Sequence, residues 1–204
     1  MKVKVLQCCG YPWAFFGLGL EHGLTSELEC CTFWAVGHRD KEDRLEEILR
    51  SLAKREDGDD THLRMIQGWA DITAPLFWWE EFEAYKGDIV CLAEPALQIA
   101  SKRPLTMDDF ELLIGEKKLR KLSAVLANGF LPAKERRAAL PDGFLHRRIV
   151  SFSYATLKKM ILQHRGSSML QWRVFLERVR PQVAYKWLLP SLDASETSEQ
   201  EDKH

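Results

Sequence analysis

The sequence predicts an α/β (α+β) fold in which a mixed sheet is packed with long helices. A first strand is predicted over Val3 to Leu6, because lysine and apolar residues alternate from Lys2 to Val5 with the period of a half-buried strand. Asp40 to Arg55 instead spaces its leucine and isoleucine residues as one face of an amphipathic helix. The 204 residues are enough to bury roughly 70% of the unfolded surface in one core. We expect one domain over residues 1–190 and a disordered acidic tail over residues 191–204.

Three more segments favour extended structure. Cys30 to Val36 is short and β-rich, and it predicts a strand or a short buried segment. Met65 to Ile72 predicts a strand before an Ala-Pro step, and the alternating segment Ile149 to Tyr154 predicts another. Between the first two predicted strands, glycines and a proline punctuate an aromatic-rich stretch over residues 10–23.

An aromatic helix is predicted over Leu76 to Lys86. Pro75 suits its first turn and Thr73 is a plausible cap. The tryptophans, phenylalanines and tyrosine of this helix give it a broad apolar surface. This surface suits a core helix better than a ligand platform, by about three to one. Pro95 interrupts the following segment, Gly87 to Ala100, which fits neither pattern.

Further helices follow in the second half of the chain. Thr106 to Asp109 resembles a capping box that opens a helix over Phe110 to Asn128. Shorter helical patterns cover Pro132 to Arg137 and Ala155 to Gln163, and a turn is expected over residues 140–143. A long amphipathic helix is predicted from Met169 to Leu189, where Pro190 stops it.

Composition limits the classes of function. The net charge of -1 argues against a dedicated nucleic-acid or membrane surface. No apolar run reaches the roughly 18 residues that a membrane span needs, so we expect a cytoplasmic protein. The five cysteines, as Cys8-Cys9, Cys30-Cys31 and Cys91, lack zinc-site spacing, and we assign no metal. The basic cluster over residues 117–121 favours a solvated face over a phosphate patch by about three to one.

Two arginines have the surroundings of an anion site. Arg137 precedes an Ala-Ala-Leu-Pro turn, and Arg165 stands between a predicted helix and the start of the next one. Backbone amides at a helix start, with a guanidinium beside them, suit a phosphate or a carboxylate. The alternative interpretation, an ordinary surface or helix-end arginine, is about as probable for each.

Four strings resemble parts of the flavin-dependent thymidylate synthases, a family of homotetrameric α/β enzymes. The strings are Ile72 to Phe77 after the first amphipathic helix, Arg136 to Pro141, Leu162 to Arg165, and Gly166 to Val174. The resemblance implies that Arg137 and Arg165 bind the phosphate of a deoxyuridylate-like pyrimidine nucleotide. It also implies a tetramer, FAD as cofactor and a role in nucleotide metabolism. The aromatic helix, with Glu81 in it, additionally resembles a pattern in phage and gut-bacterial proteins that look like remote relatives of this family.

The family's signature, RHRxxSxNxxSxR, is absent. Counted from Ala74-Pro75, its first three residues fall on Ala84, Tyr85 and Lys86, its serine near Glu94 and its last arginine near Ala96. The histidine that touches flavin in the family falls near Met65, with His62 close by. The resemblance therefore leaves Lys86, Glu81 and Glu94 as candidate nucleotide-binding residues beside Arg137 and Arg165.

Two functions follow from this pattern. The first is a divergent enzyme of the flavin-dependent type, in which Glu94 or Tyr85 supplies acid-base or ring contacts. The alternative is a catalytically inactive protein that keeps the fold to bind or sequester a nucleotide without flavin. A third interpretation, nucleic-acid modification through the basic cluster at 117–121, ranks last because the whole chain is near neutral.

Overall fold

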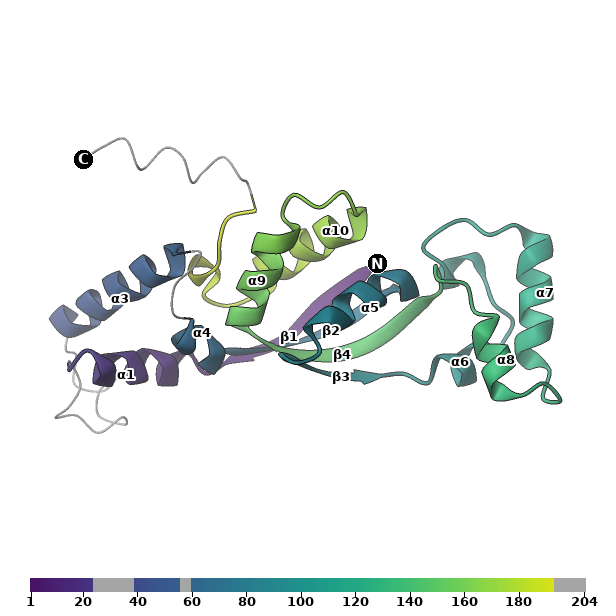
Figure 1. Cartoon of the computed structure of the whole chain (residues 1–204), viewed down its shortest axis with the longest axis horizontal. Helices are drawn as coiled ribbons and strands as arrows, with labels where there is room; N and C mark the ends of the chain where they lie inside the picture. The colour runs from purple at the N-terminus through teal and green to yellow at the C-terminus, as the bar shows by residue number, and fades with distance from the viewer. Residues whose placement is uncertain (24–38, 56–59, 193–204) are drawn as a thin grey trace. The chain divides into compact units, whose positions relative to one another are not determined.

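The computed structural model describes residues 1–23, 39–55 and 60–192. Four antiparallel strands form one sheet in the order β1-β2-β4-β3 (Figure 1). Their bounds are β1 Lys2–Cys9, β2 Gln67–Pro75, β3 Ile89–Ala93 and β4 Leu145–Ser153. The predicted α/β fold with a sheet and helices is confirmed. The predicted segment Cys30 to Val36 and most of the acidic tail lie outside the described residues.

The chain divides into two compact units. The first unit consists of Met1–Lys4 and Ala70–Val150, and the second consists of Val5–Trp69 and Ser151–His204. Strands β1, β2 and β4 each contribute residues to both units. The single domain expected over residues 1–190 stays a prediction.

Buried aromatic residues and a small helical cluster form the core of the first unit. In α5 (Leu76–Phe82), Trp78, Trp79 and Phe82 are almost fully buried and contact one another through their rings, with centroids 4.8–5.3 Å apart. The η1 turn (Glu83–Tyr85) continues this helix. The first interpretation of the aromatic helix, a core helix, is therefore confirmed.

Three helices of the first unit surround a second apolar cluster. They are α6 (Ala96–Lys102), α7 (Glu116–Ala127) and α8 (Ala133–Ala138), which Figure 1 shows side by side. Leu122 and Leu126 of α7 pack in this cluster with Phe110 and Phe144, whose rings meet edge to face. Burial of these side chains removes apolar surface from water and holds the three short helices together.

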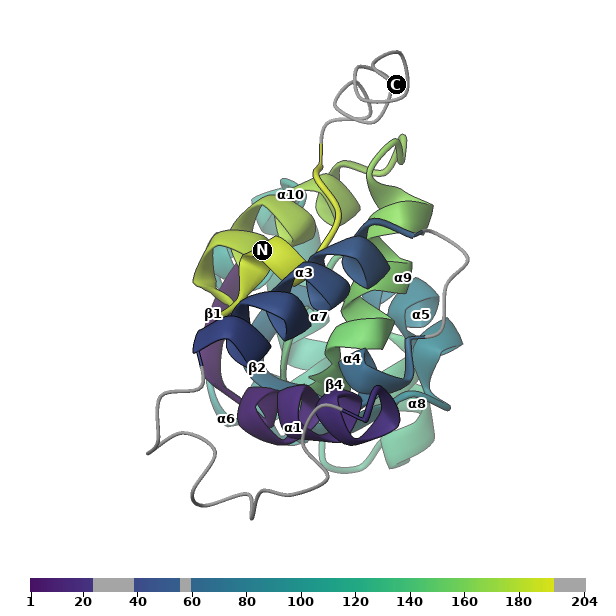
Figure 2. The same cartoon turned by 90° about the vertical axis from the view of Figure 1, so that its left-hand side faces the viewer.

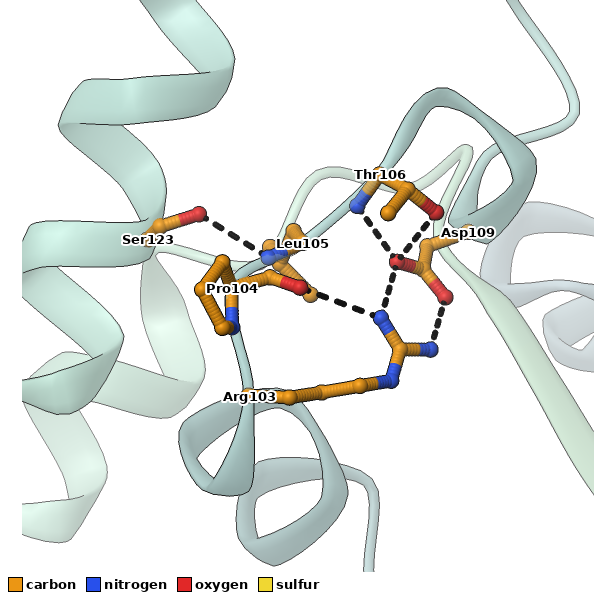
Figure 3. A network of polar contacts seen from close by, with 6 residues as sticks. All are labelled: Arg103, Pro104, Leu105, Thr106, Asp109 and Ser123. Atoms are coloured by element: carbon orange, nitrogen blue, oxygen red, sulfur yellow. Dashed lines mark hydrogen bonds and ion pairs between the residues drawn. The ribbon is translucent and has the colours of Figure 1, made fainter.

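The connection from α6 to α7 is fixed by a polar network (Figure 3). Asp109 accepts two hydrogen bonds from the guanidinium of Arg103, at 2.6 and 2.8 Å, and a third from the backbone amide of Thr106 at 2.7 Å. The amide of Leu105 donates to the hydroxyl of Ser123 in α7 at 3.1 Å. These bonds satisfy polar groups in a segment with little regular structure.

The second unit is mainly helical. It contains α1 (Tyr11–Glu21), α3 (Arg39–Lys54), α4 (Thr61–Met65), α9 (Tyr154–His164) and α10 (Leu170–Val179). Figure 2 shows α1 beside both α3 and α4, and α4 also contacts α9. Leu45 and Leu49 of α3 are almost completely buried, as the amphipathic pattern predicts. The 3-10 turns η3 (Arg180–Gln182) and η4 (Lys186–Leu188) follow α10.

A buried lysine ties α9 to the segment around α4. The side chain of Lys158 is 1% exposed, and its ammonium donates to the carbonyl of Arg55 at 2.5 Å and to the Asp60 carboxylate at 2.8 Å. Burial of a charge without partners is costly, so these two acceptors explain why the lysine is tolerated in the core.

Three helix boundaries differ from the predicted ones. The Thr106 capping box is present but opens the η2 turn (Met107–Asp109), and α7 begins only at Glu116. The long final helix ends at Val179, because Pro181 has no backbone N–H and its ring would clash with the preceding turn. Pro75 is the N-cap of α5 and not part of its first turn.

Partners distant in sequence explain where α5 begins. The amides of Leu76 and Phe77 donate to the carbonyls of Phe144 and Asp142 at 3.1 and 3.0 Å. Thr73 makes no side-chain cap for this helix, so the predicted cap is wrong. The first amides of α5 are satisfied by the turn before β4 and not by a local side chain.

Two short helices were missed by the sequence patterns. Residues 11–21 form α1 despite their glycines, and Gly10 before it has φ 96°. Thr61–Met65 forms α4, so that the following strand starts at Gln67 and not at Met65.

Strand β3 lies at an edge of the sheet and carries exposed apolar side chains. Val90 is 68% exposed and Leu92 is 74% exposed. Over the described ranges no helix is long and apolar enough to cross a membrane.

Candidate functional site: a basic hollow on the sheet of the first unit

Three neighbouring strands place polar side chains around a hollow in the first unit. Residues two apart on a strand point to the same face, so Lys2 and Lys4 of β1 share a face, as do Asp71 and Thr73 of β2. The hollow has a volume of about 340 Å³ and is lined by Lys2, Val3, Lys4, Asp71, Thr73 and Arg147. Its position follows from the strand order β1-β2-β4, which Figure 1 shows.

Arg147 is held in place by two carboxylates. Its Nε and Nη2 donate to the two oxygens of Asp71 at 2.8 and 2.6 Å, a bidentate pair. Its Nη1 donates to Glu94 at a longer 3.3 Å. The guanidinium is therefore oriented on the surface, with half of its side chain still exposed.

The positive charges around Asp71 favour the ionised form of its carboxyl group. The hydrogen bond from Arg147 lowers the pKa of Asp71, and the charge of Lys4 adds to that effect. Asp71 is therefore ionised at neutral pH and neutralises much of the charge of Arg147, whereas Lys2 and Lys4 have no ion-pair partner within the described part of the chain.

On the opposite face of β4, a second set of polar side chains makes contacts of its own. Arg148 lies 4.4 Å above the ring of Trp79 and pairs with Glu83 at 3.0 Å. The ring of His146 contacts the backbone carbonyl of Glu94 through Nε2 at 2.6 Å. Burial lowers the pKa of His146, with smaller effects from the charges of Arg148 and Arg137 that oppose the carbonyl contact, so the ring is neutral at pH 7.

The five predicted nucleotide-binding residues are divided between the two units. Glu81, Lys86, Glu94 and Arg137 belong to the first unit, and Arg165 belongs to the second. Of these five, Glu94 is in direct contact with the candidate site, through its pair with Arg147. Whether these residues bind a nucleotide stays a prediction.

The local positions of the other predicted residues are clear. Arg137 is exposed near the end of α8, and Glu81 is exposed in α5. Lys86 is exposed and caps the η1 turn. Arg165 is the C-cap of α9, five residues before α10 begins at Leu170. Its predicted place between two helices is therefore confirmed, and its charge lies where it complements the carbonyl end of α9.

The residues at the signature positions do not fit the flavin site that the resemblance implies. Ala84 has no polar side-chain atom, and Tyr85 is 5% exposed within the aromatic core. Burial, followed by the charge of Glu81, raises the pKa of Tyr85 to about 12, so it is a neutral phenol. Glu94 has its carboxylate on Arg147 and its carbonyl on His146. Among these four, Lys86 is the one that offers an accessible positive charge, and the charge of Glu94 is already paired with Arg147.

Sequence reasoning missed most of the hollow. Arg147 lies in β4, which begins at Leu145 and not at the predicted Ile149. The alternation of exposed Arg147 with buried His146 was the available signal, but two adjacent arginines concealed it. In the sequence alone, Lys2 and Lys4 indicate the alternation of a strand and give no sign of a site. No cluster of metal-binding side chains is found among the residues that the structure describes.

Solved structures of known proteins share this fold. ThyX from Helicobacter pylori, solved with FAD and dUMP, matches at a TM-score of 0.70 and 10% identity, covering 91% of this chain and 95% of that one. A second structure of that protein, also with FAD and dUMP, matches at a TM-score of 0.71 and 10% identity, covering 93% of this chain and 98% of that one. The UMP/dUMP methylase PolB from Streptomyces cacaoi, bound with 5-Br dUMP, matches at a TM-score of 0.52 and 11% identity, covering 78% of this chain and 76% of that one.

Comparison by sequence alone finds no such likeness. No protein-family model and no curated protein matches the chain. At 10–11% identity the three structures establish the arrangement of the backbone and leave side-chain chemistry open. The chain therefore has the fold of the flavin-dependent thymidylate synthases.

Proposed function

We propose that the chain binds a pyrimidine nucleotide of the deoxyuridylate class and takes part in nucleotide metabolism. The shared fold carries this proposal, since the three similar structures were solved with dUMP or its 5-bromo derivative. The matches cover 78–93% of this chain, so the likeness extends over the fold and is not confined to one local motif.

Arg137 and Arg165 are the proposed phosphate ligands. A guanidinium offers a fork of donors that matches phosphate oxygens, and both residues match arginines of the resembled family. Arg137 is exposed on α8, and no hydrogen bond or ion pair holds its guanidinium among the described residues. Lys86, Glu81 and Glu94 are proposed as secondary contacts to the sugar or base.

Binding without flavin is the form of this function that the residues support best. The positions expected to contact flavin hold a methyl group, a buried neutral phenol, one lysine and a carboxylate already paired with Arg147. Loss of each charge-assisted hydrogen bond costs about 1.5–3 kcal/mol of binding free energy. We therefore favour the nucleotide-binding or sequestering protein over the flavin enzyme.

Thermal unfolding with and without dUMP tests nucleotide binding. A ligand that binds the native state at 100 times its Kd stabilises it by about 2.7 kcal/mol, which raises the Tm. Arg137→Ala is expected to weaken binding about tenfold or more, since it removes a charge-assisted contact. Arg120→Ala, an exposed arginine of α7, is the matched control and is expected to leave the affinity unchanged.

The second arginine has a control of its own. Arg165→Ala is compared with Arg173→Ala, an exposed residue of α10. If Arg137→Ala and Arg165→Ala bind dUMP as well as their controls do, the proposed phosphate contacts are refuted. If dUMP and other pyrimidine nucleotides leave the Tm of the unmodified chain unchanged, the proposed function itself is refuted.

The visible spectrum of the purified protein separates binding protein from flavin enzyme. We expect a colourless protein whose Tm responds to dUMP and not to added FAD. A yellow protein with flavin absorbance, or a Tm raised by FAD and dUMP together, would support the enzyme and would show that other residues replace the lost signature.

A further inference from the structure

We propose that the basic hollow on β1, β2 and β4 binds a small phosphate dianion through side chains that include neither Arg137 nor Arg165. The hollow is lined by three cationic side chains and one carboxylate, Lys2, Lys4, Arg147 and Asp71, with the hydroxyl of Thr73 beside them. This site does not depend on the proposed nucleotide function.

The charge balance of the hollow favours an anion. The bidentate pair of Arg147 with Asp71 cancels one positive and one negative charge locally, and Glu94, which contacts Arg147 at 3.3 Å without lining the hollow, adds one negative charge beside it, so the whole group keeps a net charge of +1. Two lysine ammoniums then remain, and neither has an ion-pair partner among the described residues. Lys4 is close enough for its charge to lower the pKa of Asp71, so its ammonium acts within the hollow.

The donors are also suitably arranged. Lys2 and Lys4 stand two residues apart on one face of β1, and Thr73 lies on the adjacent strand β2. The ammoniums and the hydroxyl together offer hydrogen-bond donors from two neighbouring strands of the sheet. Arg147, fixed by two carboxylates, forms one wall and keeps an exposed edge.

The size of the hollow selects a small ligand. Its volume of about 340 Å³ is at the lower end of the roughly 300–1,000 Å³ that small-molecule sites span. A polymer backbone would need a continuous basic stripe, and the net charge of the chain is -1. A single phosphate group, free or as a small monoester, is the ligand that fits both the charge and the space.

Titration with inorganic phosphate, followed by NMR shifts of backbone amides in β1 and β2, tests this site. The double variant Lys2→Gln/Lys4→Gln is expected to weaken phosphate binding about tenfold, since each exposed charge contributes modestly. Lys117→Gln/Lys118→Gln changes the net charge by the same amount on the exposed face of α7 and is expected to bind as the parent does.

Asp71→Asn provides a test of opposite sign. This change removes the carboxylate that competes with an anion for Arg147, while Glu94 still contacts the guanidinium. Phosphate should therefore bind several-fold more tightly. Asp88→Asn, an exposed acidic residue outside the hollow, is the matched control for the charge change and should have no such effect.

Three outcomes overturn the proposal. If the Lys2/Lys4 and Lys117/Lys118 variants bind phosphate with equal affinity, the net charge of the chain determines binding and the hollow does not. If Asp71→Asn binds phosphate no more tightly than the parent chain does, the anion does not bind beside Arg147 in the hollow. Phosphate binding that is lost in Arg137→Ala alone places the anion at the nucleotide site.

The test is separable from that of the proposed function. If dUMP fails to bind but phosphate responds to the Lys2/Lys4 variant, the hollow stands without the nucleotide function. If dUMP and phosphate both bind more weakly in the Lys2/Lys4 variant, the hollow takes the phosphate of a nucleotide monoester; this outcome supports the hollow and contradicts Arg137 and Arg165 as the phosphate ligands of the nucleotide.

Discussion

At position 10 the backbone conformation and its neighbours leave no room for any residue larger than glycine. Its φ of 96° is rarely adopted by L-residues, and a Cβ there would overlap the backbone carbonyl of Met65. The residue lets the chain turn from β1 directly into α1 while passing close to the end of α4.

Gly10→Ala is expected to lower the free energy of unfolding by roughly 3 kcal/mol or more, because backbone strain and a steric overlap add. Gly23→Ala serves as the control: Gly23 has φ 67°, but among the described residues no atom beyond its chain neighbours lies within 4 Å of the new methyl group, so about 1 kcal/mol is expected. Urea unfolding measures both variants. Equal costs would mean that the approach to Met65 contributes nothing.

Lys158 is a second residue with a specific stability effect. Lys158→Met keeps the aliphatic stem but removes the ammonium bonded to Arg55 and Asp60. The Asp60 side chain is 25% exposed, so water compensates in part, and we expect a loss of about 2 kcal/mol. Lys159→Met, next to it and exposed, should change the free energy of unfolding by less than about 0.5 kcal/mol. Comparable losses in both variants would contradict the role of the buried pair.

The η2 turn illustrates how a short element stabilises its surroundings. The hydrogen bond from Arg103 lowers the pKa of Asp109 against the opposing effect of burial, and the amide and hydroxyl of Thr106 add to the lowering. A carboxyl group with a lowered folded-state pKa stabilises the fold above its unfolded pKa of about 3.9. That stabilisation is lost as the pH falls through the lower, folded-state pKa.

Asp109→Asn is therefore expected to cost about 1 kcal/mol at pH 7, since it weakens a cap and an ion pair. The difference from the parent chain should shrink as the pH falls below about 4, because the carboxyl group of the unfolded parent is protonated there while that of the folded parent is still ionised. Urea unfolding at several pH values checks this. Asp108→Asn, the exposed neighbour, is the control. A difference that is constant from pH 7 to pH 3 would contradict the assignment.

Among the elements, those with strong local periodicity could be predicted from sequence. Helix α3 follows from the spacing of Leu45 and Leu49, and β1 from its alternation with lysine. The start of α7 could not be predicted, because the backbone amide of Glu111 donates to the carbonyl of Gly143 at 2.9 Å and Phe110 pairs with Phe144 as a β-bridge. Long-range backbone pairing there overrides a local capping signal.

The site was less predictable than the fold. The hollow needs three strands that are remote in sequence, and the paired roles of Asp71 and Arg147 depend on that pairing. Arg137 and Arg165 were found through resemblance, and the structure places them in different units. Sequence periodicity gives the face of each strand but not which strands become neighbours.

At the scale of the whole molecule, assembly is the open prediction. The resemblance implies a tetramer, which for a chain of 23.6 kDa would be recognised by light scattering after size-exclusion chromatography. We expect four chains per particle over a wide concentration range, because obligate interfaces persist on dilution. A mass equal to that of one chain would contradict this assembly.

Exposed edge strand β3 has a consequence for handling the protein. An edge strand offers unpaired backbone groups, and natural proteins often protect such edges with lysine. Over Ile89–Ala93, β3 contains no charged residue, while Val90 and Leu92 are exposed. Concentrated samples of isolated chains should therefore join edge to edge into β-rich aggregates, and a lysine at position 90 or 92 should delay the onset of turbidity.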